Sequence, residues 1–546
     1  SIDAASGFGE IQVIGVNGVT VYLGPDDSRQ SNVLNYDNLS LKLAGTYFMD
    51  DHEISFGYEY DNLDVYNLFV QNTVGQYRFE NVVDRNTGEI LISSIENFRN
   101  GVARAYYGNA ESHNPVDAAG EFKYAINTLY IQDKYRLPNA DVTVTAGLRY
   151  DWYTSDDMPT NNPNFATRYG FSNQQNLDGK DLLQPRLGVN WVVNDSIEVR
   201  GGVGLYSGGN PNVWISNSYS NDGIRNRQFN QRGIILLGPE AVDLIGEGRP
   251  GYDVPQSLYD RVGGSAVDVS TNVTDPNFKI PSEWKYALGA TFTSVDDYVL
   301  SADLIHSSKQ DSAFITDLAL EQTATAPDGR PVYESGRAGG FNDFMLTNRK
   351  GNDGKSTVLS LSLSKEYDNG VSAAFGYAYT ESKDVHPMNS SVAFSNYHFV
   401  AASDTQNLAL STSDYEIPHR ITLNLTYSHE YFAGYETRFS LFGQAVKSNS
   451  YGYTFNRSSS DLGFNDASRQ LLYVPTLNDP NVVFATKPNS SETYEDDFNT
   501  WISEQGLESF RGGIMPRNAI EGSWWNKFDI RVEQQFPGFT AEHKGS

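Results

Sequence analysis

The histidines are the first residues to test for catalytic or metal chemistry. The pair His429-Glu430 lacks the second histidine that a zinc-protease helix requires, and it lies at the end of a predicted strand. No two of the eight histidines show the spacing of paired metal ligands; they are His52, His113, His306, His386, His398, His419, His429 and His543. We therefore predict no catalytic metal.

A serine flanked by glycines, in the string Gly204-Leu-Tyr-Ser207-Gly-Gly, is the other candidate for chemistry. It resembles a hydrolase elbow only loosely, because it is not G-x-S-x-G and no helix follows it. A glycine-rich strand end that enters a loop explains it better. A protease or phospholipase would need acidic pairs or a Ser/His set, and nothing in the sequence singles one out. We predict that the protein is not an enzyme.

Aspartate doublets occur in two kinds of connection. Asp50-Asp51 and Asp296-Asp297 fall in short turns, where aspartate favours turn geometry. Two other doublets fall in long irregular stretches, where they could hold Ca²⁺ together with carbonyl oxygens. A solvated loop is the competing interpretation, so these four residues are weak calcium candidates: Asp156, Asp157, Asp496 and Asp497. No other cofactor is predicted.

The stretch over 208–280 is the best candidate for ligand contact. It brings aromatic and charged residues close together in sequence, and binding surfaces concentrate such groups. The candidate ligand contacts are Trp214, Tyr219, Asp222, Arg225 and Arg227. The competing interpretation is that Trp214 merely packs this stretch against the rest of the fold.

Composition excludes several classes of protein. The 546 residues include 68 acidic and 40 basic side chains, for a net charge of −28. A nucleic-acid binder would need a basic stripe to displace counterions, so we predict no nucleic-acid partner. Cysteine is absent, which removes disulfides and thiolate chemistry. No run approaches the ~18 apolar residues of a membrane helix, but a membrane strand needs only about 10 residues.

Strict two-residue alternation of apolar and polar residues is the strongest pattern in the chain. The segment Leu359-Ser-Leu-Ser-Leu-Ser364 shows it most simply. Because side chains alternate across a strand, such a segment has one apolar and one polar face. The pattern recurs in about 14 segments, including a weaker one at Ile11–Tyr22 and one at Tyr124–Leu137. We predict an essentially all-β chain.

The connections between these strands alternate between short and long. Very short polar turns join the strands into hairpins, for example at Pro138-Asn-Ala140 and Tyr367-Asp-Asn-Gly370. Between hairpins lie long irregular stretches near 70–120, 155–183, 208–280, 311–354, 384–416 and 449–523. This alternation places every long loop at one end of the sheet, which is the asymmetry of an outer-membrane barrel. A soluble sandwich or propeller has no reason to sort its loops by length.

The two faces of the predicted strands also favour a membrane barrel. Aromatic residues stand near strand ends on the apolar face, as in an interfacial girdle: Tyr58, Tyr60, Tyr150, Trp152, Tyr377, Tyr379 and Trp524. The polar face carries charges that fit a wet or plugged lumen: Glu59, Asp61, Arg149, Asp151, Glu198, Arg200, Lys527, Asp529, Arg531 and Glu533. The first and last residues fall in mid-pattern, so we expect this chain to be part of a larger closed barrel.

Several longer strings resemble the barrel of Oar-like TonB-dependent outer-membrane receptors. They are Asn210-Pro-Asn-Val-Trp-Ile-Ser-Asn217, Tyr219-Ser-Asn-Asp-Gly223, Ser391-Val-Ala-Phe-Ser-Asn-Tyr397, Tyr415-Glu-Ile-Pro-His-Arg420, Asp466-Ala-Ser-Arg-Gln-Leu-Leu-Tyr-Val-Pro-Thr476, Met515-Pro-Arg-Asn-Ala519 and Trp525-Asn-Lys-Phe-Asp529. The similarity runs through nearly the whole chain. It implies a 22-stranded antiparallel transmembrane β-barrel, filled by a plug, that imports a ligand with energy from TonB.

The resemblance leaves two functions open. In the first, residues 1–546 are part of the barrel of a TonB-dependent receptor, and the plug, regulatory-like domain, TonB box and C-terminal strands lie outside them. In the second, a surface adhesion or secretion-related barrel binds partners without import. Either would lie in the outer membrane of a Gram-negative bacterium, among lipopolysaccharide and lipid.

Overall fold

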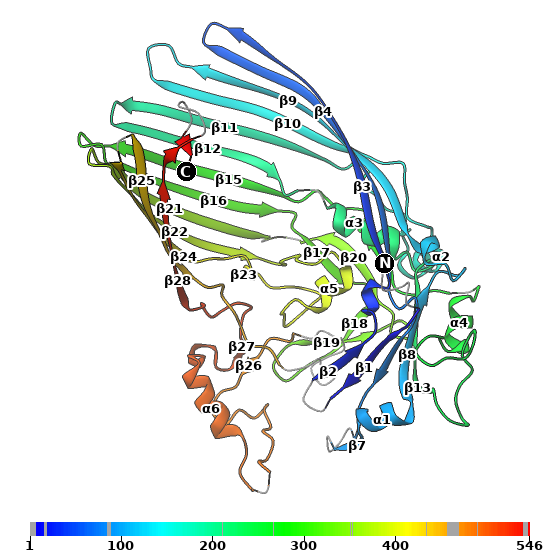
Figure 1. Ribbon diagram of the computed structural model, residues 1–546. Coiled ribbons are helices and arrows are strands. Elements are labelled where there is room, and N and C mark those ends of the chain that lie inside the picture. The colour runs from blue at the N-terminus through cyan, green and yellow to red at the C-terminus, as the bar shows by residue number, and fades with distance from the viewer. Residues whose placement is uncertain are drawn as a thin grey trace.

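The computed structural model describes most of the chain. The described residues are 7–15, 19–84, 89–209, 211–265, 267–349, 351, 353–432, 434–455, 469–488, 490–538 and 544–545. One 14-stranded antiparallel sheet, which we call the membrane sheet, dominates them (Figure 1). Its strands in chain order are β3 (Ser31–Met49), β4 (His52–Val70), β9 (Gly120–Arg136), β10 (Val142–Thr154), β11 (Asp181–Asn194), β12 (Ile197–Ser207), β15 (Ser282–Thr293), β16 (Val299–Gln310), β21 (Gly354–Glu366), β22 (Val371–Asp384), the short β23 (Ser411–Thr412), β24 (His419–Phe432), β25 (Tyr435–Lys447) and β28 (Trp524–Gln534).

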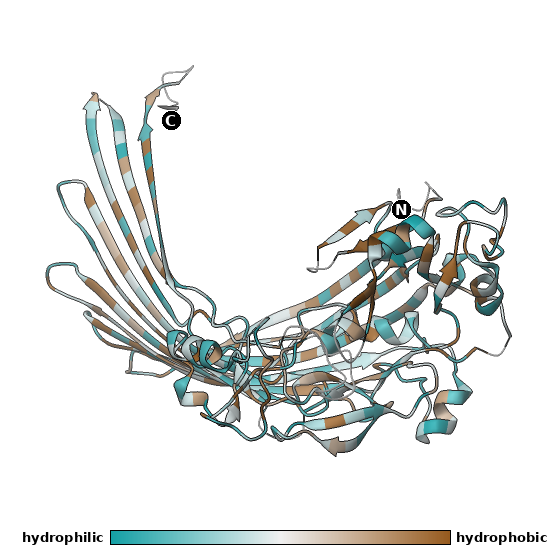
Figure 2. Cartoon of the chain, turned by 90° about the horizontal axis from the view of Figure 1, so that it is seen from below, coloured by the Kyte–Doolittle hydropathy of each residue, from teal (hydrophilic) through white to brown (hydrophobic). Residues whose placement is uncertain are grey.

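The long strands of the membrane sheet pair with their neighbours in the chain, from β3 at one edge to β28 at the other. The sheet curves into a trough (Figure 2). Within the described residues no strand pairs with the outer side of β3 or β28, so the sheet is open between them. The predicted all-β architecture is confirmed for the sheet; its closure into 22 strands stays a prediction.

The predicted sorting of connections by length is confirmed. Short turns join β3 to β4, β9 to β10, β11 to β12, β15 to β16, β21 to β22 and β24 to β25. They lie together at the upper left of Figure 1, and the long connections lie at the other end. Asp50 and Asp297 have positive φ angles of 49° and 60°, so these aspartates do serve turn geometry.

The outward face of the membrane sheet is apolar and exposed. Leu43, Phe528 and Ile530 are 76%, 67% and 79% exposed, respectively. Each pairs with another residue of its face, as Ile530 does with Leu441. A contiguous apolar surface of this extent is stable against lipid rather than water.

Among the described residues, every helix is too short or too polar to cross a membrane.

A second assembly, which we call the loop layer, comprises the described residues of the six long loops together with 7–30. Its largest unit is a five-stranded sheet in the order β13-β8-β5-β1-β2. These strands are β1 (Glu10–Ile14), β2 (Thr20–Leu23), β5 (Gln76–Phe79), β8 (Val102–Asn109) and β13 (Arg227–Ile235). The prediction that Ile11–Tyr22 is a barrel strand is therefore wrong. Its alternating pattern belongs to a small sheet that is packed on one face, with β1 parallel to β5.

The remaining elements of the loop layer are short. Its helices are η2 (Asp27–Arg29), α1 (Ser94–Asn100), η3 (Pro115–Ala118), α2 (Pro163–Tyr169), α3 (Asn212–Ser220), α4 (Gln256–Val262), α5 (Ala393–His398), α6 (Glu495–Glu504) and η5 (Glu508–Phe510). Its other strands are β6 (Val82–Val83), β7 (Ile90–Ile92), β14 (Thr271–Thr274), β17 (Ala313–Asp317), β18 (Leu320–Thr325), β19 (Pro331–Ser335), β20 (Asp343–Asn348), β26 (Tyr473–Val474) and β27 (Gly513–Ile514). Beyond β28 lie β29 (Phe536–Pro537) and β30 (Lys544–Gly545).

Candidate functional site

The inner face of the membrane sheet carries a network of charges across β3, β4 and β10. Lys42 Nζ lies 2.7 Å from Glu59 Oε1, and Arg149 Nη1 lies 2.8 Å from Glu59 Oε2. Arg149 Nε also contacts Asp151 Oδ1 at 2.9 Å. Gln184 on β11 extends the network by donating to Asp151 Oδ2 at 2.6 Å. We call this region the charged wall, and it confirms the predicted polar face of these strands.

The charged wall continues as far as β16. Arg200 Nη2 contacts both carboxylate oxygens of Asp303, at 2.7 and 2.8 Å. The pair lies over Gly289, where a Cβ would meet Asp303 Oδ1 at 2.2 Å, so any other residue there would have to displace it. These charges compensate one another within the wall, which lowers the cost of placing them on a membrane-spanning strand.

The inner face of β21, β22 and β24 is chemically different. Small and uncharged residues lie opposite one another along it: Ser360 and Ala378, Ser362 and Gly376, Ser364 and Ala374, and Gly376 and Thr422. Asn424 and Thr426 extend this surface on β24. We call it the hydroxyl wall. It provides a polar, uncharged surface in the middle of the sheet, and Arg420, which pairs with Ala378, borders it at the loop end of β24.

The structure brings three of the five predicted ligand contacts together after α3. Asp222 is fully buried, and its carboxylate accepts hydrogen bonds from the backbone of Ile224 and Arg225, each at 2.8 Å. Arg225 Nε donates to the same carboxylate at 2.7 Å, and its Nη2 donates to the Tyr219 carbonyl at 2.6 Å. These groups organise the turn that follows α3.

The other two predicted contacts lie apart from this turn. Arg227 is buried, and it donates to the carbonyls of Val262 and Gly264 while contacting Glu111 Oε2 at 2.7 Å. Trp214 is half-buried against a hydrophobic core of the loop layer, and its Nε1 donates to the Ser390 carbonyl at 3.3 Å. All five residues have partners within the chain, and ligand binding by them stays a prediction.

Helix α3 also holds the loop that contains α5. Asn217 Nδ2 donates to the Ser391 carbonyl at 2.7 Å, and Asn217 Oδ1 accepts from the Ala393 amide at 3.1 Å. Two of the strings that carry the resemblance therefore meet in space, although they lie far apart in the chain.

The two acidic doublets proposed for calcium lie in different surroundings. The Asp157 carboxylate, next to Asp156, accepts from the Lys123 amide at 2.7 Å. Asp496 and Asp497 lie in the first turn of α6, where Asp497 contacts Lys487 at 2.9 Å. Among the described residues, no group of three or more His, Asp or Glu side chains could hold a metal ion. Calcium at these doublets stays a prediction.

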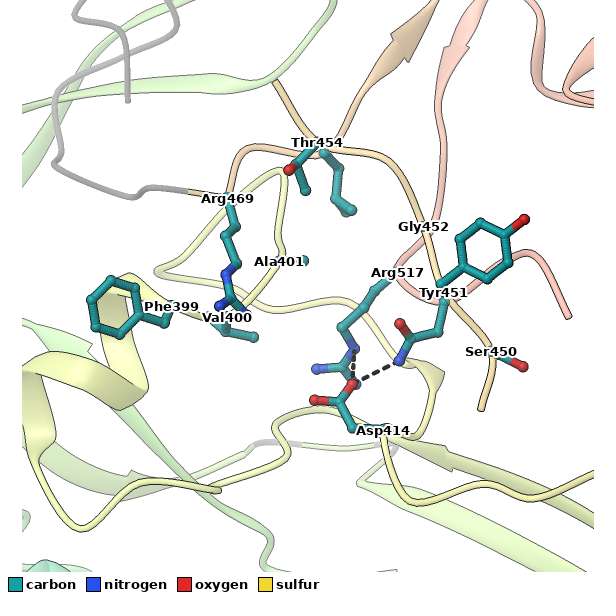
Figure 3. Close-up of a pocket in the computed structure, with 12 residues that line it drawn as sticks. Phe399, Val400, Ala401, Asp414, Ser450, Tyr451, Gly452, Thr454, Arg469 and Arg517 are labelled. Carbon is teal, nitrogen blue, oxygen red and sulfur yellow. Dashed lines mark hydrogen bonds and ion pairs between the residues drawn. The ribbon is translucent and has the colours of Figure 1, made fainter. Parts of the chain in front are cut away.

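A cavity of about 360 Å³ lies between the last two long loops (Figure 3). Its lining includes Phe399 and Asp414 from one loop and Tyr451, Arg469 and Arg517 from the other. Three of the strings that carry the resemblance contribute to it or adjoin it. The resemblance identified those strings in the sequence, but nothing in the sequence indicated that they form one site, because none of them contains a ligand-binding signature.

The buried floor of this region contains a charge pair and a histidine. Arg517, which is 4% exposed, pairs with Asp384 at the end of β22. His386 lies close by; its Nδ1 accepts from the Met388 amide at 2.9 Å, and its Nε2 donates to the Asn396 carbonyl at 3.0 Å. Burial lowers the pKa of His386 to about 4. The imidazole is therefore neutral at pH 7.

Comparison with known proteins gives a family match over nearly the whole chain. The model of the outer membrane beta barrel domain matches residues 2–544. A search of curated proteins finds no significant match.

Solved structures that are similar to this chain include two bacterial transporters and a bacterial receptor. The outer membrane transporter YddB from Escherichia coli is 14% identical, with a TM-score of 0.44 over 83% of this chain and 48% of its own. The FrpB iron transporter from Neisseria meningitidis is 11% identical, with a TM-score of 0.40 over 93% and 50%. A mutant ferric enterobactin receptor PfeA from Pseudomonas aeruginosa is 9% identical, with a TM-score of 0.36 over 81% and 46%.

The chain thus spans about half the length of these solved structures. The family match agrees with the apolar outer face, the charged inner face and the gathering of long loops at one end of the membrane sheet. The chain therefore belongs to the outer membrane beta barrel family, and the protein lies in the outer membrane of a Gram-negative bacterium.

Proposed function

We propose that this chain forms part of the barrel of an outer-membrane receptor that captures a ligand in its loop layer and passes it through the lumen. The observation that carries this proposal is the position of the cavity. Its floor is anchored to Asp384 at the end of β22, and β22 contributes to the hydroxyl wall below. A captured solute would pass Arg420 at the loop end of β24 and then move along a polar surface whose remaining residues are uncharged.

TonB would supply the energy for this passage, and the resemblance to Oar-like receptors supports that part of the proposal. A plug from outside these residues would fill the trough and rearrange when TonB pulls on it. The strings that carry the resemblance include Met515–Ala519 at the cavity and, at the contact between α3 and α5, the part of the Asn-Pro-Asn-Val-Trp-Ile-Ser-Asn string that ends at Asn217. Their positions favour a role in capture over a role in the membrane-spanning wall.

The alternative function is adhesion or secretion-related partner binding without import. The size of the loop layer favours it, because the layer has its own five-stranded sheet and its own hydrophobic cores. A structure of that size presents a large surface to other cells or macromolecules.

The two functions can be separated in the native bacterium with the full-length protein. We would compare spent medium from the wild type, a strain without this protein, and a strain without TonB, using untargeted mass spectrometry. Import predicts that the same solute accumulates in the medium of both mutants and disappears from the wild type. If the three strains leave the same solutes in the medium, and only the strain without this protein loses surface attachment, import is contradicted and adhesion is supported.

A further inference from the structure

The cavity between the last two loops has an arginine on one side that the described chain leaves uncompensated. The Arg469 guanidinium lies 5.9 Å from the centre of the Phe399 ring. No hydrogen-bond or ion-pair partner for this guanidinium lies among the described residues. A guanidinium held against an aromatic face presents its planar set of N–H donors to the cavity, and that geometry matches a carboxylate.

The other side of the cavity presents a carboxylate. Asp414 Oδ1 accepts from Asn518 Nδ2 at 2.7 Å and lies 4.0 Å from Arg517 Nε (Figure 3). Arg517 is already paired with Asp384, and its buried Nε makes no hydrogen bond within the described residues. The Asp414 side chain remains 36% exposed. Among the described residues Asp414 Oδ2 has no partner, so this oxygen can accept from a donor in the cavity.

Apolar surface separates these two charged groups. Val400, Ala401 and Leu471 contribute to the lining, and the rings of Phe399 and Tyr451 are 46% and 43% exposed at its border. Ligand sites are commonly apolar surfaces with a few polar groups that fix orientation, and they begin at volumes of about 300 Å³. A cavity of 360 Å³ falls at the small end of that range.

We propose that this cavity binds a short peptide as a zwitterion, an inference that rests on the proposed capture of a ligand by the loops. The peptide's carboxylate pairs with Arg469, its ammonium group donates to Asp414, and an apolar or aromatic side chain lies against Phe399. Because two arginines face two aspartates here, the site is matched to a ligand without net charge.

A phosphate group would also fit the guanidinium of Arg469, but the surroundings disfavour it. A doubly charged anion in so small a cavity would be repelled by Asp414 and would leave that carboxylate without a donor. The net charge of −28 on the chain repels anionic ligands further.

The test is calorimetric titration of the purified full-length receptor with the dipeptide phenylalanyl-alanine, its C-terminal amide and its N-acetyl form. We expect the free dipeptide to bind at least tenfold more tightly than either blocked form. Arg469→Gln should remove the preference over the amide, and Asp414→Asn should remove the preference over the N-acetyl form. Each variant should lose only its own preference, which a general loss of structure would not produce.

Arg232→Gln is the matched control, because Arg232 is an exposed arginine on β13 in a different part of the loop layer. It should leave both preferences unchanged. Equal affinity for the three ligands, no binding of the dipeptide, or inorganic phosphate competing at equal concentration would each overturn the peptide assignment. If the receptor binds the dipeptide but shows no TonB-dependent depletion of the medium, the proposed peptide site stands and the proposed import function is wrong. If the medium is depleted in a TonB-dependent way but the dipeptide does not bind, the import function stands and the peptide site is wrong.

Discussion

The membrane sheet pairs each long strand with a neighbour in the chain, whereas the loop layer buries together residues from distant loops. One core of the loop layer contains Tyr219, Phe278 and Tyr397, and it extends to the loop ends of the sheet strands at Val65. In the sheet, by contrast, large apolar side chains such as Leu43 are exposed. The sheet is therefore stabilised by strand pairing and lipid, and the loop layer by the burial of apolar groups from water. The two regions should respond to different perturbations.

The largest expected effect is the removal of one loop. Replacing residues 208–280 by a short glycine-serine linker deletes α3, β13, α4 and β14, and with them parts of two cores. Ser207 and Ser282 are paired, so the linker joins β12 to β15 directly. We expect ligand binding to be lost, because α3 holds the loop that contributes Phe399 and Asp414 to the cavity. Protease resistance of the loop layer should also be lost, while the barrel still inserts and still resists heat in SDS.

Heat-modifiable migration in SDS gels reports on the sheet, and limited proteolysis on the loop layer. If the linker variant retained ligand binding, the assignment of Trp214 and its neighbours to the ligand would be wrong. Loss of heat resistance would instead show that the two regions are not separable.

A buried charge cluster provides the second test. Asp343 is fully buried; it contacts Arg337 Nη1 at 2.8 Å and Arg168 Nη2 at 3.1 Å, and it accepts from the Tyr169 hydroxyl at 2.8 Å. Asp343→Ala would remove one of the two carboxylates that Arg168 and Arg337 share, the other being Asp268. We expect this to lower the free energy of unfolding of the layer by about 3 kcal/mol, because a buried ion pair is broken. Hydrogen exchange of loop peptides should rise, with unchanged exchange in the strands.

Asp195→Ala, in an exposed turn of the membrane sheet, is the control for this substitution. It should leave hydrogen exchange unchanged in both the loop peptides and the strands. Increased exchange throughout the strands of the Asp343 variant would contradict the proposed independence of the two regions.

His386 should make the loop layer sensitive to pH. Its pKa of about 4 lies below the value of 6.5 in the unfolded chain, so the unfolded state binds a proton first as the pH falls. The stabilisation is complete above pH 6.5 and is lost on acidification towards pH 4, by roughly 3 kcal/mol. Hydrogen exchange of peptides over 385–400, corrected for intrinsic rates, should show this loss.

His386→Asn should abolish that pH dependence, whatever its stability at pH 7, while the exposed His429→Asn should preserve it. An unchanged pH profile in the His386 variant would assign the sensitivity to another group.

The smallest expected effect compares the two faces of one strand. Leu361→Arg on β21 puts a charge on the lipid side and should destabilise the sheet by roughly 2 kcal/mol. Ser360→Arg puts the same charge on the hydroxyl wall, where it meets the lumen, and should have little effect on folding. Urea unfolding in detergent or lipid measures both, and equal destabilisation would refute the assignment of the faces.

The membrane sheet could be predicted from the sequence because strands and tight turns are determined by residues that are neighbours in the chain. The alternation in Leu359–Ser364 depends only on side-chain direction along β21, and the connection at Tyr367–Gly370 depends only on turn chemistry. Strand order then follows from the hairpins. The same alternation at Ile11–Tyr22 misled the prediction, because a small water-facing sheet and a membrane strand produce the same pattern.

The loop layer could not be predicted in the same way, because its contacts join distant segments. Nothing near Asp343 in sequence points to Arg168, and nothing near Phe399 points to Arg469. The sequence did single out Asp222 and Arg225 by residue type. The structure pairs them with each other. Residue type alone cannot tell such an internal pair from two residues that bind a ligand.

The five-stranded sheet of the loop layer imposes an order on biogenesis. Its strands come from residues 10–23, from the loop after β4 and from the loop after β12. β13 can complete this sheet only once those three segments have all reached the cell surface, which requires that β3, β4, β9, β10, β11 and β12 already span the membrane. Until then, β8 would present an unpaired edge that chaperones and proteases can reach. Completion of this small sheet would therefore mark the moment at which the strands of the membrane sheet from β3 to β12 are in place.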